Sequence, residues 1–339
     1  MTTDKQKDPC TQALHSLSGD QLKFLQNLPK AELHAHLNGS IPLPCLQALA
    51  KEHPQFPPGS LPETIIKGLD ILSKGFVLND INDFFGLFPA IYALTSTPKV
   101  LSSVTRDVLT HFLEPGPDGS PAQCSYMELR STPRMTEHMS RQQYLIAVLD
   151  EIEKYPANKA VLIVSIDRRM SLRDLTECVD LSIALKEVGR RIVGIDLCGD
   201  PLASDMNDFR HHFLRAKEAG LKITLHIAET PKNTEEDTLT LLSFGPSRLG
   251  HATFLSDKAQ DIILRERIPI EIFKSLEEHH IQWFLKRDHP IAICTDDILP
   301  FRNSLVGEYA LLMADPPFGL GLTENEIRRI AEMGFESKF

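Results

Sequence analysis

Two kinds of hydrophobic pattern alternate along the chain. Eight β-rich runs of apolar residues, two of them short, occur at residues 31–37, 126–129, 160–166, 192–197, 222–226, 248–250, 268–273 and 291–295. Between them, apolar residues recur at helical spacing. The clearest of these stretches are residues 140–155, 171–188, 208–219, 257–266 and 323–331. The alternation predicts strands that are separated by helices.

Local signals mark the ends of several of these helices. Ser140 and Ser171 are suitable N-caps, and Gly220 follows a helical stretch as a C′ glycine. Parallel strands need long, usually helical, connections, so the pattern predicts an α/β fold, a parallel (β/α)8 TIM-type barrel. An open, doubly wound sheet has the same periodicity, and this alternative stays open here.

We expect one large domain. The 339 residues fall within the usual length of an α/β barrel, and no structureless linker divides them. Residues 41–113 read as an additional, mostly helical segment between strands 1 and 2, longer than one crossover needs, that can form a lid over one barrel end. The prediction is a polar N-terminal tail over residues 1–20 and a single barrel domain over residues 21–339.

Composition narrows the functions that are open to the chain. Hydrophobic residues make up 42% and charged residues 24%, as in ordinary globular proteins. The net charge of −10 argues against a nucleic-acid partner, because binding a polyanion needs clustered Lys and Arg. The six cysteines are scattered without a CxxC pair, which indicates reduced thiols. With no leader-like segment and no membrane-spanning apolar run, we expect a cytosolic monomer without a membrane partner.

Two histidines lie two residues apart in the first expected strand. Within ELHAHLNGS, His34 and His36 point to the same face, because side chains alternate along a strand with a period of two. Two imidazoles on one rigid strand supply half of a zinc site, with nitrogen ligands at about 2.0–2.1 Å from the metal. Histidines of the core or of a loop are the alternative, which this pair alone does not exclude.

Three further groups follow later strands. The strand in LKITLHIAET ends in His226, a candidate third ligand, and Glu229 follows as a candidate proton shuttle. His251 in RLGHATF is a further ligand or a base that orients water. Asp296 and Asp297 end the strand of IAICTDD, where adjacent carboxylates repel unless a cation or hydrogen-bond donors separate them. Solvated surface residues are the alternative, but all these groups fall at carboxyl ends of strands, where barrel enzymes place catalytic groups.

The order of these motifs resembles that of one family. The series HxH, HxAE, GH and TDD, over residues 28–297, is similar to that of the adenosine and AMP deaminases. The resemblance implies a (β/α)8 barrel that holds one Zn2+ with a water completing the site. The implied zinc ligands are His34, His36, His226 and Asp296. It also implies that Glu229 protonates the purine ring and that His251 activates or orients the water. Asp297, the backbone of Gly199 and the ligand His36 are the implied substrate contacts.

Two segments resemble the N6-methyl-AMP deaminases of this family. Asn38 lies where adenosine deaminases usually have an aspartate, and an amide tolerates a phosphate that a carboxylate would repel. The segment RSTPR offers two hydroxyls and a guanidinium, which suit a 5′-monophosphate. The candidate substrate-binding residues there are Ser131, Thr132, Pro133 and Arg134. The sequences GDP and IDRR, which contains Asp167, match as well. The resemblance implies deamination of N6-methyl-AMP and related N6-substituted purine nucleoside monophosphates to IMP and an amine.

Some features depart from the family pattern. After strand seven, IPIEIFKSLEEHHIQWF passes almost directly into a helix, so the domain is expected to be shortened there and at its C-terminus. Tyr92 stands near a position where a relative has histidine. A deaminase of free adenosine is the nearest rival function, and a catalytically impaired purine-binding isoform is another. Arg134 can also pair with a surface carboxylate instead of a phosphate.

Overall fold

Eight parallel strands form a barrel in the computed structural model, which describes residues 8–52, 61–74, 86–203, 205–272 and 280–339. The strands are β1 (Ala31–His36), β2 (Tyr126–Ser131), β3 (Ala160–Asp167), β4 (Ile192–Cys198), β5 (Lys222–Ile227), β6 (Arg248–His251), β7 (Ile270–Ile272) and β8 (Ile291–Ile293). Each strand pairs with the next one along the chain. The Asp296 amide donates to the His34 carbonyl at 2.7 Å, and the His36 amide donates to the Asp296 carbonyl at 3.0 Å. These bonds join β1 to the chain after β8, so the barrel is confirmed over the open sheet.

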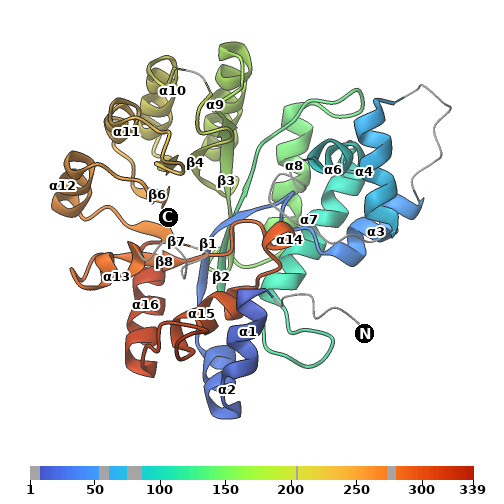
Figure 1. The fold of residues 1–339 in the computed structure, drawn as a ribbon. Helices are drawn as coiled ribbons and strands as arrows, with labels where there is room; N and C mark the ends of the chain where they lie inside the picture. The colour runs from blue at the N-terminus through green and yellow to red at the C-terminus, as the bar shows by residue number, and fades with distance from the viewer. Residues whose placement is uncertain (1–7, 53–60, 75–85, 204, 273–279) are drawn as a thin grey trace.

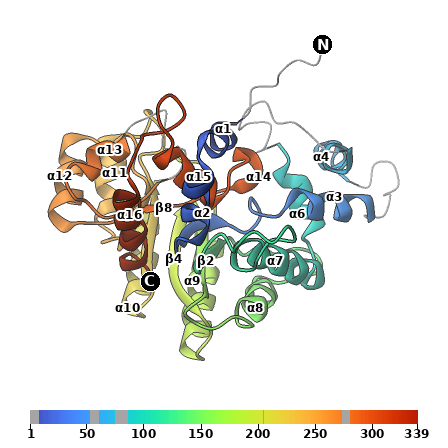
Figure 2. The same cartoon turned by 90° about the horizontal axis from the view of Figure 1, so that it is seen from below.

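Helices surround the strands (Figures 1 and 2). They are α1 (Pro9–Ser16), α2 (Gly19–Asn27), α3 (Leu43–Glu52), α4 (Glu63–Lys74), α6 (Phe88–Leu94), α7 (Pro98–Leu113), α8 (Arg141–Ile152), α9 (Leu172–Glu187), α10 (Asn207–Glu218), α11 (Glu235–Leu242), α12 (Asp257–Glu266), α13 (His280–Leu285), α14 (Ile298–Phe301), α15 (Leu305–Met313) and α16 (Glu324–Glu336). Ser140 and Ser171 cap α8 and α9 as predicted, and Gly220 follows α10 with φ 79°. Within the described ranges, no helix has both the length and the apolar character to cross a bilayer.

The strands alternate between an apolar outer face and a charged interior. In β2, Met127 belongs to the main apolar core, and the next residue, Glu128, is fully buried on the opposite, interior face. The lower end of the interior is apolar: Ala31 of β1 lies in register with Tyr126 of β2, and Phe335 of α16 packs against their cluster. The same alternation around the barrel gives the interior a set of buried polar groups, namely Glu128, Arg130, Asp196, Thr224, Arg248 and Glu271.

The N-terminal region was expected to be a polar tail over residues 1–20, but helices α1 and α2 occupy part of it. Asp8 caps α1, and Cys10 and Ala13 of this helix are buried in the core. The chain is therefore helical from residue 9, because an amphipathic turn that is rich in polar residues still buries its few apolar side chains against α15.

The additional segment between β1 and β2 is helical, as predicted, in its described part. Helices α3, α4, α6 and α7 lie together on one side of the barrel (Figure 1). The expected shortening after strand seven falls partly on residues 273–279, which lie outside the described residues.

Candidate active site

Four predicted metal ligands converge at the carboxyl end of the barrel. His34 and His36 come from β1, His226 from β5, and Asp296 follows β8. One ligand atom from each lies within 4.8 Å of those of the others. His226 Nε2 lies 3.1 Å from His34 Nε2 and 3.2 Å from His36 Nε2. Asp296 Oδ1 lies 3.2 Å from His34 Nε2 and 3.4 Å from His36 Nε2.

These spacings fit one shared zinc ion. Ligand atoms that each lie about 2.0–2.1 Å from a common metal are separated from one another by roughly 3–3.5 Å. Burial lowers the pKa of His36 to about 3, so its imidazole is neutral and offers a lone pair. Burial raises the pKa of Asp296, but the hydrogen bond and charge of His34 outweigh burial and lower it. Neutral imidazoles and an ionised carboxylate are the donor set that zinc prefers.

Two carboxylates orient the ligating imidazoles. His34 Nδ1 donates to Glu271 Oε2 at 2.6 Å, and His226 Nδ1 donates to Asp196 Oδ1 at 2.9 Å. Because a carboxylate only accepts, each bond fixes the proton on Nδ1 and turns the lone pair of Nε2 toward the candidate metal position. Neither acid was predicted from the sequence. Their signal was a single acidic residue within an otherwise apolar strand, in IVGIDLC and in IPIEIF.

Buried arginines hold these carboxylates in turn. Arg130 Nη2 donates to Glu271 at 2.9 Å, and Arg130 Nη1 lies 3.3 Å from Asp196. Arg248 forms a further short contact with Glu271 through its Nε. Burial raises the pKa of Glu271, but the two arginines and His34 outweigh this effect and lower it well below its usual value. The carboxylate therefore stays ionised inside the barrel.

Glu229 and His251 form a pair beside the metal ligands. His251 Nε2 lies 2.6 Å from Glu229 Oε1, and the rings of His251 and His226 lie 5.1 Å apart. Burial raises the pKa of Glu229, but the facing His251 lowers it more strongly, to about 2. The structure thus brings the predicted proton donor and the predicted water-orienting residue into direct contact, with the carboxyl ionised in this arrangement.

Asp297 is half-buried beside Gly39, with its Oδ1 atom turned into the protein. A Cβ on Gly39 would lie only 1.7 Å from Asp297 Oδ1, so this position admits no side chain while Asp297 keeps its place. Burial, and then the charge of Asp296, raise the pKa of Asp297 well above its usual value. Asp297 Oδ1 and Asn38 Nδ2 are buried atoms without a hydrogen-bond partner among the described residues. Buried polar atoms are almost always paired, so these two are suited to meet a ligand.

A chain of hydroxyls leads from Asn38 to β2. The Ser131 and Tyr144 hydroxyls share a hydrogen bond at 2.7 Å, and the Tyr144 hydroxyl donates to Asn38 Oδ1 at 3.4 Å. Tyr144 comes from α8 and was not predicted, because nothing in an amphipathic helix distinguishes a tyrosine at the site from a core tyrosine.

Arg134 lies against aromatic side chains. Its guanidinium carbon is 3.4 Å from the centre of the Tyr92 ring, and its Nη2 donates to Thr95 Oγ1 at 3.3 Å. The ring of Tyr144 is 5.8 Å away. Tyr92 thus orients the guanidinium by stacking, an interaction that favours arginine over lysine.

The remaining predicted substrate-binding residues lie on neighbouring elements. Pro133 is buried, and Thr132 Oγ1 lies 3.7 Å from Cys198 Sγ. Asp167 forms two hydrogen bonds with the Arg169 guanidinium, at 2.9 and 2.6 Å. Gly199 has φ 95°, and a Cβ there would come within 2.6 Å of Asp167 Oδ1. Glycine is therefore required at this position by its backbone and by its neighbour.

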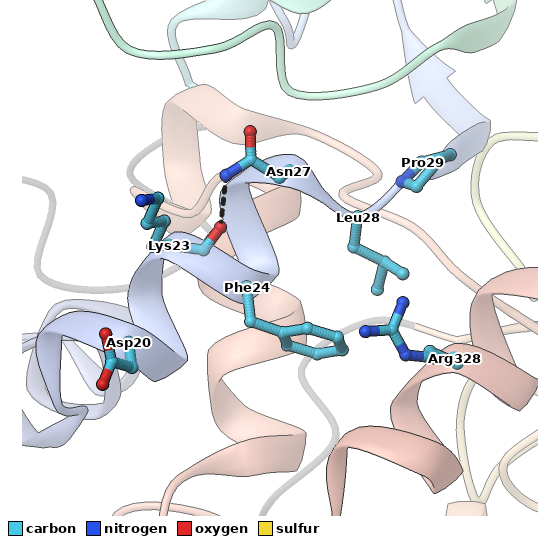
Figure 3. A pocket seen from close by; sticks show the side chains of 7 residues that line it. All are labelled: Asp20, Lys23, Phe24, Asn27, Leu28, Pro29 and Arg328. Carbon is cyan, nitrogen blue, oxygen red and sulfur yellow. Dashed lines mark hydrogen bonds between the residues drawn. The ribbon is translucent and has the colours of Figure 1, made fainter.

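The backbone is strained at this end of the barrel. Four of the seven non-glycine residues with positive φ in the described part of the chain lie at the site, namely Ala228, His251, Ala252 and Asp296. Such conformations cost about 1–3 kcal/mol each and persist where the surroundings enforce them. A separate hollow of ≈ 290 Å³ between α2 and α16, where Phe24 and Arg328 meet, contains none of these residues (Figure 3).

The fold and the site define a (β/α)8 barrel enzyme with a candidate three-histidine, one-aspartate metal centre. The adenosine deaminase family model matches residues 29–339. The chain is 33% identical over 312 residues to human N6-methyl-AMP deaminase, and the alignment covers 85% of this chain and 83% of the relative. It therefore belongs to the adenosine deaminase family and is a hydrolytic deaminase.

Solved structures of related proteins are also similar to this chain. The apo structure of N6-methyl-AMP deaminase from Arabidopsis thaliana is 30% identical, covers 94% of both chains and superimposes with a TM-score of 0.78. A crystal structure of Arabidopsis ADAL in complex with IMP is also 30% identical, covers 93% of both chains and gives a TM-score of 0.76.

Proposed function

We propose that this chain hydrolyses N6-methyl-AMP and related N6-substituted purine nucleoside monophosphates to IMP and an amine. The observation that carries the proposal is the polar group of Arg134, Ser131, Tyr144 and Asn38, which adjoins the candidate metal centre. This group offers a guanidinium and neutral hydrogen-bonding side chains, as a 5′-phosphate requires. The names of the human and Arabidopsis relatives, and the IMP in one of their structures, support this substrate class.

We propose one Zn2+ held by His34, His36, His226 and Asp296. The ligand spacings of 3.1–3.4 Å and the carboxylates that fix the imidazole tautomers support this choice. When bound, the ion would supply Lewis-acid activation of a water at neutral pH.

The Glu229–His251 pair transfers protons in this proposal. Because Glu229 is ionised beside His251, it must gain a proton before it can protonate the purine ring. His251 acts as the base that orients the attacking water and accepts a proton from it, and the 2.6 Å contact gives this proton a direct path to the Glu229 carboxyl. Glu229 then acts as the acid that passes the proton to the ring and lowers the barrier to addition.

Asp297, His36 and Gly199 bind and orient the base. A protonated Asp297 donates a hydrogen bond, which suits a ring nitrogen that only accepts. A side chain at position 199 would collide with Asp167, so the residue is glycine. Without a side chain, the Gly199 backbone can approach the purine ring. Asn38, Ser131, Thr132, Pro133 and Arg134 line the phosphate end in this proposal.

The phosphate end can be tested with one charge change. Arg134→Gln removes the guanidinium, and a charged hydrogen bond of about 1.5–3 kcal/mol corresponds to roughly 10–150-fold in kcat/KM for N6-methyl-AMP. The rate on the free nucleoside, N6-methyladenosine, should not change. Arg141→Gln is a matched control, since Arg141 pairs with Asp174 and Glu177 on the outside of the barrel. Equal losses on nucleotide and nucleoside, or a wild-type preference for the nucleoside, would refute the phosphate assignment.

We also propose a cytosolic monomer. Among the described residues no two cysteines are joined by a disulfide, as expected in a reducing compartment. Sedimentation of the purified protein and fractionation of cells check these two statements.

A further inference from the structure

The C-terminal residues of the chain contact the charged interior of the barrel. Ser337 is buried, and its carbonyl accepts a hydrogen bond from Arg248 Nη1 at 2.7 Å. The Phe339 amide donates to Glu128 Oε1 at 2.7 Å, and the Phe339 ring lies 3.8 Å from the Arg248 guanidinium carbon. In Figure 1 the C-terminus lies among the barrel strands. Glu128 and Arg248 belong to the first halves of β2 and β6, so these contacts are at the end of the barrel opposite to the site.

Arg248 also reaches the candidate metal centre. Its Nε contacts Glu271 Oε1, and the other oxygen of that carboxylate accepts from His34 Nδ1 at 2.6 Å. Its Nη2 donates to Glu128 Oε2 at 2.5 Å. Arg248, Glu128, Glu271 and His34 are all fully buried, so water does not screen the series.

We propose that Ser337 and Phe339 are positioning residues for the metal ligand His34, acting through Arg248 and Glu271. The Nε atom of Arg248 keeps its contact with Glu271 only while the other two nitrogens of the guanidinium also keep their hydrogen bonds. The Ser337 carbonyl and Glu128 hold those nitrogens, and the Phe339 ring covers the plane. If the ring is lost, the guanidinium can turn, the bond to Glu271 lengthens, and the His34 imidazole loses the partner that orients its Nε2.

The inference rests on the proposed metal centre, so the test measures metal directly. The probes are the rate of zinc transfer to a chelator and the visible absorption of the cobalt-substituted protein, which reports ligand geometry. Phe339→Ala should release zinc roughly 3–10-fold faster and shift the cobalt spectrum, and Arg248→Lys should release it about 10–100-fold faster. Phe339→Tyr keeps the ring and should match the wild type.

Phe335→Ala is the matched control. Phe335 lies on α16 and packs against the apolar cluster of Ala31, Leu33 and Tyr126 at the same end of the barrel, whereas the ring stacked on the Arg248 guanidinium is that of Phe339. It should lower the melting temperature about as much as Phe339→Ala and leave the cobalt spectrum unchanged. Identical zinc release and spectra in wild type, Phe339→Ala and Arg248→Lys would overturn the inference, as would equal effects of the two phenylalanine variants. A wild-type chain that binds neither metal would instead overturn the metal centre and, with it, this inference.

Discussion

A single methyl group at Gly39 should reduce the activity of this protein. A Cβ there would lie 1.7 Å from Asp297 Oδ1, 2.2 Å from its Cγ and 2.8 Å from its Cβ. The Gly39 backbone is outside the left-handed region, so alanine is not strained by the backbone itself. Gly39→Ala therefore acts by one route, because the Asp297 carboxyl must leave its position.

The magnitude follows from the contact that is lost. If Asp297 donates to the purine ring, its displacement leaves a ring nitrogen without a partner, which costs about 1–3 kcal/mol. That range corresponds to a fall in kcat/KM of roughly 5–150-fold. Asp297→Ala should give a similar loss. In the Asp297→Ala background, Gly39→Ala should cost much less, because the two closest atoms are gone.

Steady-state deamination of N6-methyl-AMP, with the zinc content and melting temperature of each variant, measures these effects. Gly19→Ala is the control, because a Cβ on Gly19 has nothing within 4 Å. Additive losses in the double variant, or full activity of Gly39→Ala with normal stability, would show that Asp297 does not contact the substrate from this position.

Three further predictions concern the metal centre and the proton path. Glu229→Gln should keep its zinc and lose about 10²–10⁴-fold in kcat, measured by release of methylamine; full activity in the zinc-loaded variant would exclude Glu229 as the acid. Asp196→Asn removes the charge behind His226 and should weaken zinc binding about 10–100-fold in a chelator competition, whereas unchanged binding would contradict the role of this carboxylate. Removal of zinc by a chelator should abolish deamination, and added zinc should restore it; activity that survives complete removal would refute the metal requirement.

The strands and the motifs were predictable because their signals are local. Each predicted strand overlaps an observed one, and β1 begins at Ala31 as expected. Period-two alternation alone placed His34 and His36 on one face. The tail was predicted less well, since half of the eight residues of α1 are polar and its apolar residues Cys10, Ala13 and Leu14 show that it packs against the core only once the tertiary structure is known.

The sequence by itself determined which residues can bind a metal and in what order the strands carry them. Only the tertiary structure decided which carboxylates and arginines orient these ligands. Glu271 and His34 are 237 positions apart, and Arg248 and Glu128 are 120 apart, so no local period connects them. The proximity of Gly39 to Asp297 likewise depends on the meeting of β1 and β8. Closure of the barrel creates these contacts, because it brings the interior faces of distant strands around a common axis.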